Sequence, residues 1–166
     1  VIISIFGPIS GAHFNPVVSL IFWFKKIISL SDLVAYVLFQ IIGAIFGCLA
    51  ANIIFGLPIV SISTHVRHDL SQFLSEILAT FGLVLVIFLA REVARLNIPV
   101  LVGSYIASAY WFSSSTSFAN PAVTIARQFS DTFTGISPSG IPSFVLAQIF
   151  GAILGYIVVQ LLSRDM

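Results

Sequence analysis

Charged residues are scarce in this sequence, and their scarcity decides the class of protein. Asp, Glu, Lys and Arg make up 8% of the 166 residues, whereas hydrophobic residues make up 58%, and the mean hydropathy is +1.11. A soluble domain carries about 25% charged residues, so a water-exposed surface cannot be built from this composition. The sequence therefore predicts an integral, multi-pass membrane protein. Its net charge of +1 gives no basis for a nucleic-acid partner.

Cysteine and a charged N-terminal region are also lacking. Cys48 is the single cysteine, so there is no disulfide framework, and we expect this residue to pack among its apolar neighbours. The chain opens at Val1 in an apolar run with no basic residues before it, which is not the pattern of a secretory signal peptide. The absent initiator methionine indicates a fragment or a processed chain.

An Asn-Pro motif occurs twice, at residues 15–16 and 120–121, and each copy predicts the start of a helix. Asn is a favoured N-cap, and Pro suits the first helical position because its missing N–H would have no partner there. The motifs are followed by similar residues, Val-Ser-Leu and Val-Thr-Ile. Further on, Gln40–Gly47 recurs as Gln148–Gly155. The chain is therefore an internal duplication.

The apolar segments have two lengths. Those at 15–24 and 120–129 hold about ten residues, or about 15 Å of helix, which is half of a hydrocarbon core of about 30 Å. We expect both to enter the membrane without crossing it. Complete spans are predicted at 32–55, 71–90, 100–112 and 142–162, loops at 9–14, 56–70, 113–119 and 130–139, and the tail of a helix at 1–6, broken by Gly7-Pro8.

The basic residues predict the topology. If the first half-length helix enters from the cytoplasm, strict alternation places five of them inside and two outside, as the positive-inside rule requires. The inside set is Lys25, Lys26, Arg91, Arg95 and Arg164, and the outside set is Arg67 and Arg127. The half-length helices then enter from opposite faces, so the two repeats are inverted.

Two half-length helices entering from opposite faces imply a pore. Non-helical backbone at membrane depth persists only against protein or beside a wet cavity. The helix N-termini meet near the midplane, each with about half a positive charge, so they repel cations while neutral molecules pass. The amide NH2 groups of Asn15 and Asn120 are expected to be free to donate to a passing oxygen, because their carbonyls are used in capping.

Residues 10–17, Ser-Gly-Ala-His-Phe-Asn-Pro-Val, together with 118–122, Phe-Ala-Asn-Pro-Ala, resemble the major intrinsic protein family, the aquaporins and aquaglyceroporins. The resemblance covers the whole chain. It implies an all-α membrane fold, an inverted repeat of spanning helices with two re-entrant half-helices, in one channel domain over 1–166. By comparison with the family, the first repeat (1–55) is truncated and lacks the first span and most of the second, whereas the second repeat (71–166) is complete.

The resemblance also implies a set of site residues. The pore constriction falls at Asn15, Pro16, Val17, Asn120, Pro121 and Ala122, the pore-lining loops at Gly11, Ala12, His13, Ser115, Thr116 and Phe118, and the selectivity filter at Ser108, Ser117 and Val123. The acidic residue inside a span, Glu76, is expected to brace the second pore loop by hydrogen bonding. Neither catalysis nor a cofactor or metal is implied, and a homotetramer in a bacterial plasma membrane is expected.

Two of these positions depart from the family pattern. Val17 stands where Ala is usual, and we expect its extra methyls to narrow or reshape the constriction. Val123 stands where the family typically has an arginine. Arg127 lies four residues further on, and we expect it to be an interfacial anchor or a partner of Asp131. Small filter residues without the arginine resemble bacterial aquaglyceroporin-like channels, which pass glycerol-sized polyols or neutral metalloid hydroxides such as arsenite.

Two other functions stay open at this stage. Inverted repeats with broken helices also occur in alternating-access carriers, although no ion-coordinating acid stands beside either half-helix. A truncated chain that conducts nothing and serves only as a membrane partner is the other alternative. His65 and His68 are assigned to an exposed polar loop rather than to a metal site. The pairs Gly43/Gly47 and Gly151/Gly155 are assigned to close helix packing.

Overall fold

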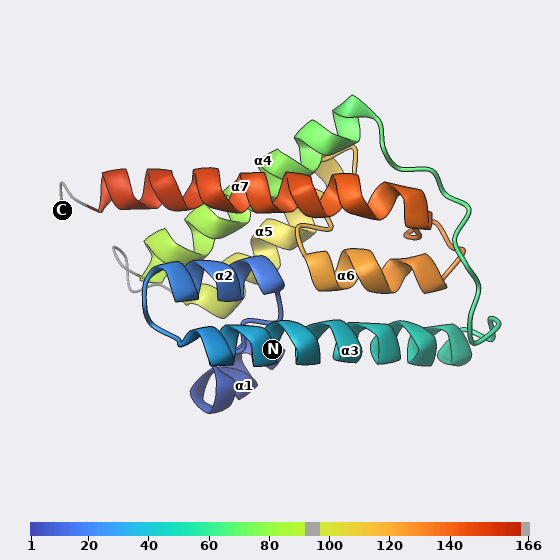
Figure 1. Ribbon diagram of the computed structural model, residues 1–166, viewed down its shortest axis with the longest axis horizontal. Helices are drawn as coiled ribbons and strands as arrows, with labels where there is room; N and C mark the ends of the chain where they lie inside the picture. The colour runs from blue at the N-terminus through green and yellow to red at the C-terminus, as the bar shows by residue number, and fades with distance from the viewer. Residues whose placement is uncertain (92–96, 164–166) are drawn as a thin grey trace.

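The computed structural model describes residues 1–91 and 97–163, and each regular element in these ranges is a helix (Figure 1). The predicted all-α fold is therefore confirmed. The helices are α1 (Ile2–Ser10), α2 (Pro16–Phe24), α3 (Leu30–Ile54), α4 (Leu70–Leu89), α5 (Ile98–Phe112), α6 (Pro121–Ala126) and α7 (Ile141–Leu162), with 3₁₀ turns η2 (Arg127–Phe129) and η3 (Pro138–Gly140).

Three of the described helical segments are long and apolar enough to cross a membrane, namely α3, α4 and the combined η3–α7 segment. Their bounds agree with the predicted spans to within a few residues. The helix expected as a complete span over 100–112 is shorter than a span requires, because α5 has 15 residues and a crossing takes about 20. Residues 92–96, which precede it, lie outside the described ranges.

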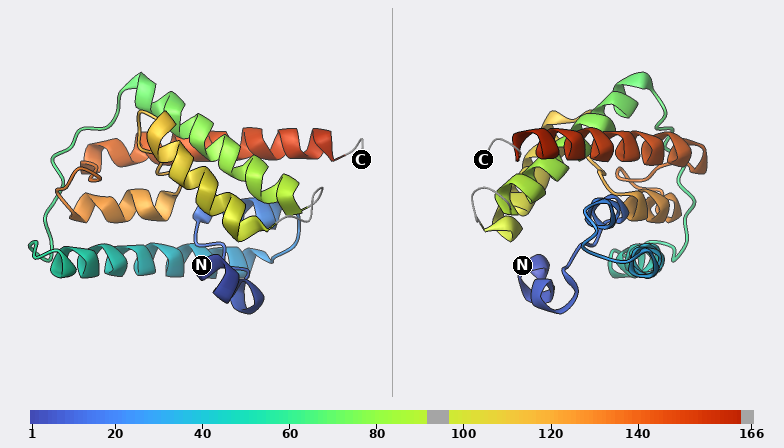
Figure 2. Two further views of the ribbon diagram at one scale, coloured as in Figure 1. Left: turned by 180° about the vertical axis from the view of Figure 1, so that it is seen from behind. Right: turned by 60° about the vertical axis from the view of Figure 1, so that its left-hand side comes forward.

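The half-length helices α2 and α6 are stacked end to end between α3 and α7 (Figures 1 and 2). Each begins as predicted. The Asn15 side chain accepts from the Val17 N–H at 3.1 Å, and the Asn120 side chain accepts from the Ala122 N–H at 3.0 Å. The nine residues of α2 span about 14 Å. The two N-termini face each other at the centre of the fold, so the two helices run in opposite directions.

The close packing of α4 against α7 depends on two glycines. A Cβ at Gly151 would lie 2.4 Å from the Ile77 carbonyl oxygen, and one at Gly155 would lie 2.9 Å from that of Phe81. Any side chain at these positions would force the helices apart. The prediction that Gly151 and Gly155 are packing glycines is confirmed.

The corresponding prediction for Gly43 and Gly47 is wrong for this chain. Both glycines are exposed on α3, and a Cβ at either would meet no atom of the described residues within 4 Å. The reason is that α3 buries only Leu33 and Asn52 among its 25 residues. A sequence repeat therefore reproduces the glycine spacing without reproducing the contact.

The N-terminal helix is longer than the sequence predicts. The Gly7-Pro8 pair does not break it, and because Gly7 has no Cβ, one of the clashes that a proline ring makes with the preceding residue is absent. The helix α1 continues to Ser10 and ends at Gly11, whose φ of 71° is left-handed, a conformation that glycine adopts without strain. The predicted loop 9–14 is thus confined to 11–15.

The basic residues are divided between two ends of the fold. Lys25 lies near the Phe88 ring and Arg91 lies over the Phe22 ring, both at the C-terminal end of α2. Arg67 and Arg127 lie together near Phe118, on the α6 side. This separation agrees with the predicted inside and outside sets. Arg95 and Arg164, which belong to the inside set, lie outside the described residues.

Candidate functional site: a cavity where two half-helices meet

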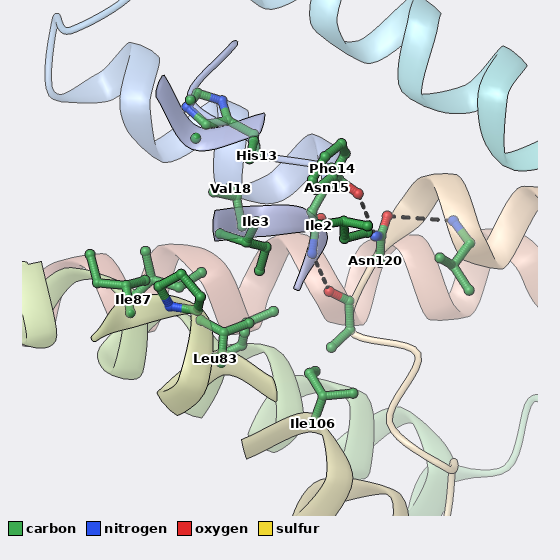
Figure 3. A pocket seen from close by; sticks show the side chains of 18 of the residues that line it. Ile2, Ile3, His13, Phe14, Asn15, Val18, Leu83, Ile87, Ile106 and Asn120 are labelled. Atoms are coloured by element: carbon green, nitrogen blue, oxygen red, sulfur yellow. Dashed lines mark hydrogen bonds between the residues drawn. The ribbon is translucent and has the colours of Figure 1, made fainter. Parts of the chain in front are cut away.

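The two Asn-Pro loops are joined by a reciprocal pair of hydrogen bonds. The Asn15 amide nitrogen donates to the Ala119 carbonyl at 2.7 Å, and the Asn120 amide nitrogen donates to the Phe14 carbonyl at 2.9 Å (Figure 3). Each amide therefore caps its own helix with its oxygen and holds the opposite loop with its nitrogen. The expectation that both NH2 groups are wholly free is wrong, since one N–H of each donates to the opposite loop.

The residues that supply these two carbonyls share an unusual backbone conformation. Phe14 has a φ of 49° and Ala119 a φ of 47°, and each directly precedes its asparagine. A left-handed conformation is uncommon for residues other than glycine and persists only where the surroundings hold it. The reciprocal hydrogen bonds are part of what holds it here.

Polar side chains also repeat between the two halves. Gln40 donates to the Ser19 hydroxyl at 3.0 Å, and Gln148 donates to the Thr124 hydroxyl at 2.8 Å. Ser19 and Thr124 each lie four residues after an Asn of the motif, one helical turn along. The duplication read from the sequence thus extends to side-chain contacts on both half-helices.

A buried carboxylate holds the second loop. Glu76 of α4 is fully buried and accepts from the backbone N–H groups of Phe118 at 2.8 Å and Ala119 at 2.9 Å. It also accepts from the Ser115 hydroxyl at 2.6 Å and from Gln148 Nε2 at 2.6 Å. Four donors surround the two oxygens, as a buried charge requires. The loop is therefore fixed to α4 at Ser115, Phe118 and Ala119.

The first loop is held by rings instead of a carboxylate. The imidazole of His13 packs against Phe22 and Tyr36, with ring centroids 4.1 and 4.9 Å away, and its Nδ1 lies 3.1 Å from the Ser19 hydroxyl. The Tyr36 hydroxyl donates to the Ser10 carbonyl at 2.5 Å. His13 therefore shapes its loop and also lines the cavity described next.

A cavity of about 500 Å³ passes the junction of the half-helices. One wall is apolar and is formed by Leu83, Ile87 and Ile106 (Figure 3). The predicted site residues that line the cavity are Gly11, Ala12, His13, Asn15, Ser117, Phe118, Asn120 and Val123, and Phe14 and Ala119, which were not predicted, line it too. Arg91 and Arg127 line it as well. The cavity thus extends from Arg91 past both asparagines to Arg127.

Other predicted constriction residues lie behind the cavity wall. Pro16, Val17, Pro121 and Ala122 form the buried first turns of α2 and α6. The side chain of Val17 is 1% exposed and packs in the apolar core with Ile21 and Val84. Its extra methyls therefore do not narrow the cavity, contrary to the prediction.

Three predicted pore positions also do not line the cavity. The Ser115 hydroxyl is turned to Glu76, and neither Ser115 nor Thr116 lies on the cavity wall. Ser108 is exposed, and its hydroxyl donates to the Ser104 carbonyl. Ile106 faces the cavity, and a residue two positions further is turned by about 200° around the helix. Of the three expected filter residues, the structure brings together Ser117 and Val123 only.

Two arginines that the sequence analysis gave no role at the pore meet at the outer end of this cavity. The guanidinium carbons of Arg127 and Arg67 lie 4.2 and 5.4 Å from the centroid of the Phe118 ring. The predicted Arg127–Asp131 pair is not formed, because the Asp131 carboxylate accepts from the N–H and hydroxyl of Thr64. Arg67 stands in an irregular loop, and Arg127 lies seven residues, or about two helical turns, after Asn120. Both are weak sequence signals of a position at the cavity.

Asn52 is a further residue that the sequence analysis passed over. It is 2% exposed on α3, which buries only one other residue, Leu33, and its amide nitrogen donates to the carbonyls of Ile59 at 3.0 Å and Phe129 at 2.9 Å. Its oxygen accepts from the Ser130 hydroxyl at 2.7 Å. It ties the loop that carries Arg67 to the end of the second half-helix. The sequence feature that could have indicated this role was the single Asn52 amide near the end of a predicted apolar span.

The fold and this site together define a polytopic helical membrane protein with two re-entrant half-helices joined beside a cavity. The profile of the Major intrinsic protein family matches residues 1–112, and the chain belongs to that family. Aquaglyceroporin AqpS of Rhizobium meliloti is 49% identical over 153 residues, which cover 92% of this chain and 66% of that protein.

More distant relatives include an aquaglyceroporin of Toxoplasma gondii, 29% identical over 93% of this chain and 59% of its own. Aquaporin-4 of Homo sapiens is 31% identical over 90% of this chain and 44% of its own. The chain thus spans about two thirds or less of the length of these relatives.

Proposed function

We propose that this protein is a passive transmembrane channel for water and small uncharged solutes, with no catalysis and no cofactor. The observation that carries the proposal is the reciprocal pair of bonds between Asn15 and Ala119 and between Asn120 and Phe14. These bonds fix two opposed helix N-termini at one point beside a cavity. Membership of the Major intrinsic protein family supports the same function.

The geometry accounts for selection by charge. Each helix N-terminus carries about half an elementary positive charge, and the two ends together oppose a cation or a proton at the junction. A neutral solute keeps hydrogen bonds there, because each asparagine retains an N–H and the loops offer carbonyl oxygens. The side chains of the wall formed by Leu83, Ile87 and Ile106 offer no hydrogen-bonding groups. A solute is therefore held on one side only and passes without tight binding.

The class of solute follows from the residues near the outer end. Ser117 and Val123 are small and uncharged, which favours passage of glycerol-sized polyols, or of neutral metalloid hydroxides such as arsenite, besides water. The relatives named as aquaglyceroporins are consistent with this class. By the same relationship we expect a homotetramer with one pore per subunit, in a bacterial plasma membrane.

Reconstitution into liposomes tests the proposal. Stopped-flow light scattering would record water flux after an osmotic step and swelling in a glycerol gradient, with protein-free liposomes as the control. A channel gives flux that does not saturate with solute concentration and depends weakly on temperature. Saturable, ion-coupled uptake would indicate a carrier instead. Fluxes equal to those of the lipid alone would indicate a non-conducting membrane protein, and a response to water alone would exclude the polyol class.

A further inference from the structure

Two consecutive lysines stand at the C-terminal end of α2, at the end of the fold where α4 and α7 also end (Figure 1). Lys25 is the C-cap of α2 and is half-buried, whereas Lys26 is exposed. The Nζ atom of Lys25 lies 5.8 Å from the centroid of the Phe88 ring of α4 and 6.0 Å from that of Tyr156 of α7, which are cation–π distances. The charge of Lys25 is therefore held between two helices.

The backbone of Lys26 has a conformation that normally selects glycine. Its φ is 58°. Its N–H donates to the Trp23 carbonyl at 2.8 Å, and the Ile27 N–H donates to the Phe22 carbonyl at 3.0 Å, which is the Schellman pattern of helix ends. Glycine is favoured at this left-handed position because a side chain is strained there. The turn thus does not explain the lysine, whose side chain adds a second charge beside Lys25.

Aromatic and aliphatic side chains surround the lysines. Phe24 stacks on Tyr156 with ring centroids 6.1 Å apart, and Trp23 packs on Phe24 at 5.2 Å. Aromatic residues of this kind mark the level of the lipid headgroups. Beside Tyr156, one side of α7 forms a stripe of apolar side chains, each 48–56% exposed and spaced by three or four residues. The stripe consists of Phe150, Leu154, Ile157 and Leu161.

The charge at this end of the fold is positive on balance. The acidic residue that follows the lysines most closely in the chain, Asp32, already accepts from the N–H and the hydroxyl of Ser29. The five basic residues assigned to the inner side outnumber the three acidic residues of the same segments, which are Asp32, Glu92 and Asp165. An anion is therefore favoured at the inner end of α2.

We propose that Lys25 and Lys26 bind the phosphate of an anionic membrane lipid whose acyl chains lie along the exposed stripe of α7. Basic residues next to a membrane attract anionic headgroups, and the stripe gives the same lipid an apolar surface. A free phosphate ion shares the headgroup chemistry but would leave the stripe unused, so the lipid is favoured. The inference goes beyond the proposed channel function, because it concerns the bilayer and not the solute.

The test uses Trp23, which lies two residues before the lysines. Trp111 is the other tryptophan of the chain, so Trp111→Phe leaves Trp23 as the single indole fluorophore, and every variant carries this change. The protein would be reconstituted in phosphatidylcholine vesicles that contain a minor share of phosphatidylglycerol, with bromine on the acyl chains of one lipid or the other. Bromine quenches tryptophan on contact, so the two quenching curves show which lipid lies beside Trp23.

The variants separate charge from folding. Lys25→Gln combined with Lys26→Gln removes both charges, and Lys25→Arg combined with Lys26→Arg keeps them. Lys26→Gly removes one charge and also relieves the left-handed backbone, so its effect does not come from a strained fold. Arg91→Gln is the matched control, because Arg91 stands over the Phe22 ring at the same end of the fold but lines the cavity.

We expect the wild type to prefer phosphatidylglycerol at Trp23 at least about fivefold over its share of the bilayer, which is the effect of one basic residue near a membrane surface. The preference disappears in the double Gln variant and falls at least about twofold in Lys26→Gly. It stays at the wild-type value in the double Arg variant and in Arg91→Gln.

A wild type without this preference overturns the inference. An equal fall in Arg91→Gln and in the double Gln variant also overturns it, because the cause would then be the diffuse charge of the inner surface. Displacement of the brominated phosphatidylglycerol by inorganic phosphate, at fixed ionic strength, would assign the lysines to a free anion and overturn the lipid. Quenching requires no flux, so these outcomes are independent of the channel function.

Discussion

Gln148 lies directly against Glu76, with its amide nitrogen 2.6 Å from the carboxylate. The same nitrogen donates to the Thr124 hydroxyl at 2.8 Å. One side chain of α7 therefore joins the acid that holds the second loop to the half-helix that the loop begins. Both side chains are fully buried, so this junction has no water to replace a lost partner.

Replacing the Glu76 carboxylate by an amide should destabilise the protein. In Glu76→Gln one acceptor oxygen becomes an NH2 group facing donors, which leaves at least one buried N–H without a partner at a cost of about 1–3 kcal/mol. We expect the melting temperature in detergent to fall by about 5 °C or more. The matched carboxylate-to-amide change Asp32→Asn, in the exposed capping box of α3, should have a smaller effect. Equal melting temperatures would contradict a bracing role for Glu76.

The two glycine pairs should respond differently to alanine. Gly151→Ala places a Cβ against the Ile77 carbonyl, and the resulting shift of α7 from α4 should cost about 1–3 kcal/mol. Gly43→Ala meets no described atom and removes a glycine from a helix interior, which should be neutral or stabilising by up to about 1 kcal/mol. Thermal unfolding of both variants measures the difference. A loss in Gly43→Ala as large as that in Gly151→Ala would show that α3 is covered in the assembled protein.

Removing the Asn52 amide should release the loop that carries Arg67. In Asn52→Leu the carbonyls of Ile59 and Phe129 lose a shared donor, so the loop should open more often and expose the Arg67 peptide bond. Limited trypsin digestion with mass spectrometry measures cleavage after Arg67, which is slow while that residue is buried. The control is Asn97→Ala, which removes the cap of α5. Cleavage after Arg67 at the wild-type rate would contradict a docking role for Asn52.

Low pH should weaken a second attachment of the loop that carries Arg67, the hydrogen bond between Thr64 and Asp131. The hydrogen bond from the Thr64 N–H lowers the pKa of Asp131 below its ordinary value. A carboxyl whose pKa is depressed by folding contributes stability above its unfolded pKa, and that contribution is lost as the pH falls through the folded pKa. Exchange of the Thr64 amide hydrogen, corrected for its intrinsic pH dependence, should therefore accelerate at low pH. Asp131→Asn should exchange faster than the wild type at neutral pH, and unchanged exchange would contradict the assignment.

The elements of the fold were predictable where local chemistry decides them. Asn-Pro followed by an apolar run defines the start of α2 and of α6, and segment length separates half-helices from spans. Where tertiary contacts decide, prediction failed. Gly43 repeats Gly151 in sequence but a Cβ there would meet no atom among the described residues, and α1 continues through Pro8.

The residues of the site were predictable where they belong to the two repeated Asn-Pro motifs and their loops. Asn15, Asn120 and the predicted loop residues Gly11, Ala12, His13 and Phe118 lie on the cavity as expected. Ser108 was assigned to the filter from the resemblance to the family, but the rotation of α5 turns Ile106 to the cavity instead. Arg67 comes from an irregular loop with no periodicity, so no pattern could bring it to the Phe118 ring. Residue spacing in the sequence therefore did not identify Ile106 and Arg67, whose places at the site depend on three-dimensional packing.

The bond from Asn15 to Ala119 spans 104 residues of sequence. During synthesis the first re-entrant segment therefore inserts long before its counterpart leaves the ribosome, and its carbonyls must be shielded by other means in the interval. Closure of the junction is a late event, possible only after α4 and α5 have been threaded into the bilayer. A stalled or prematurely terminated chain would present the polar backbone of the first loop to lipid without its partner.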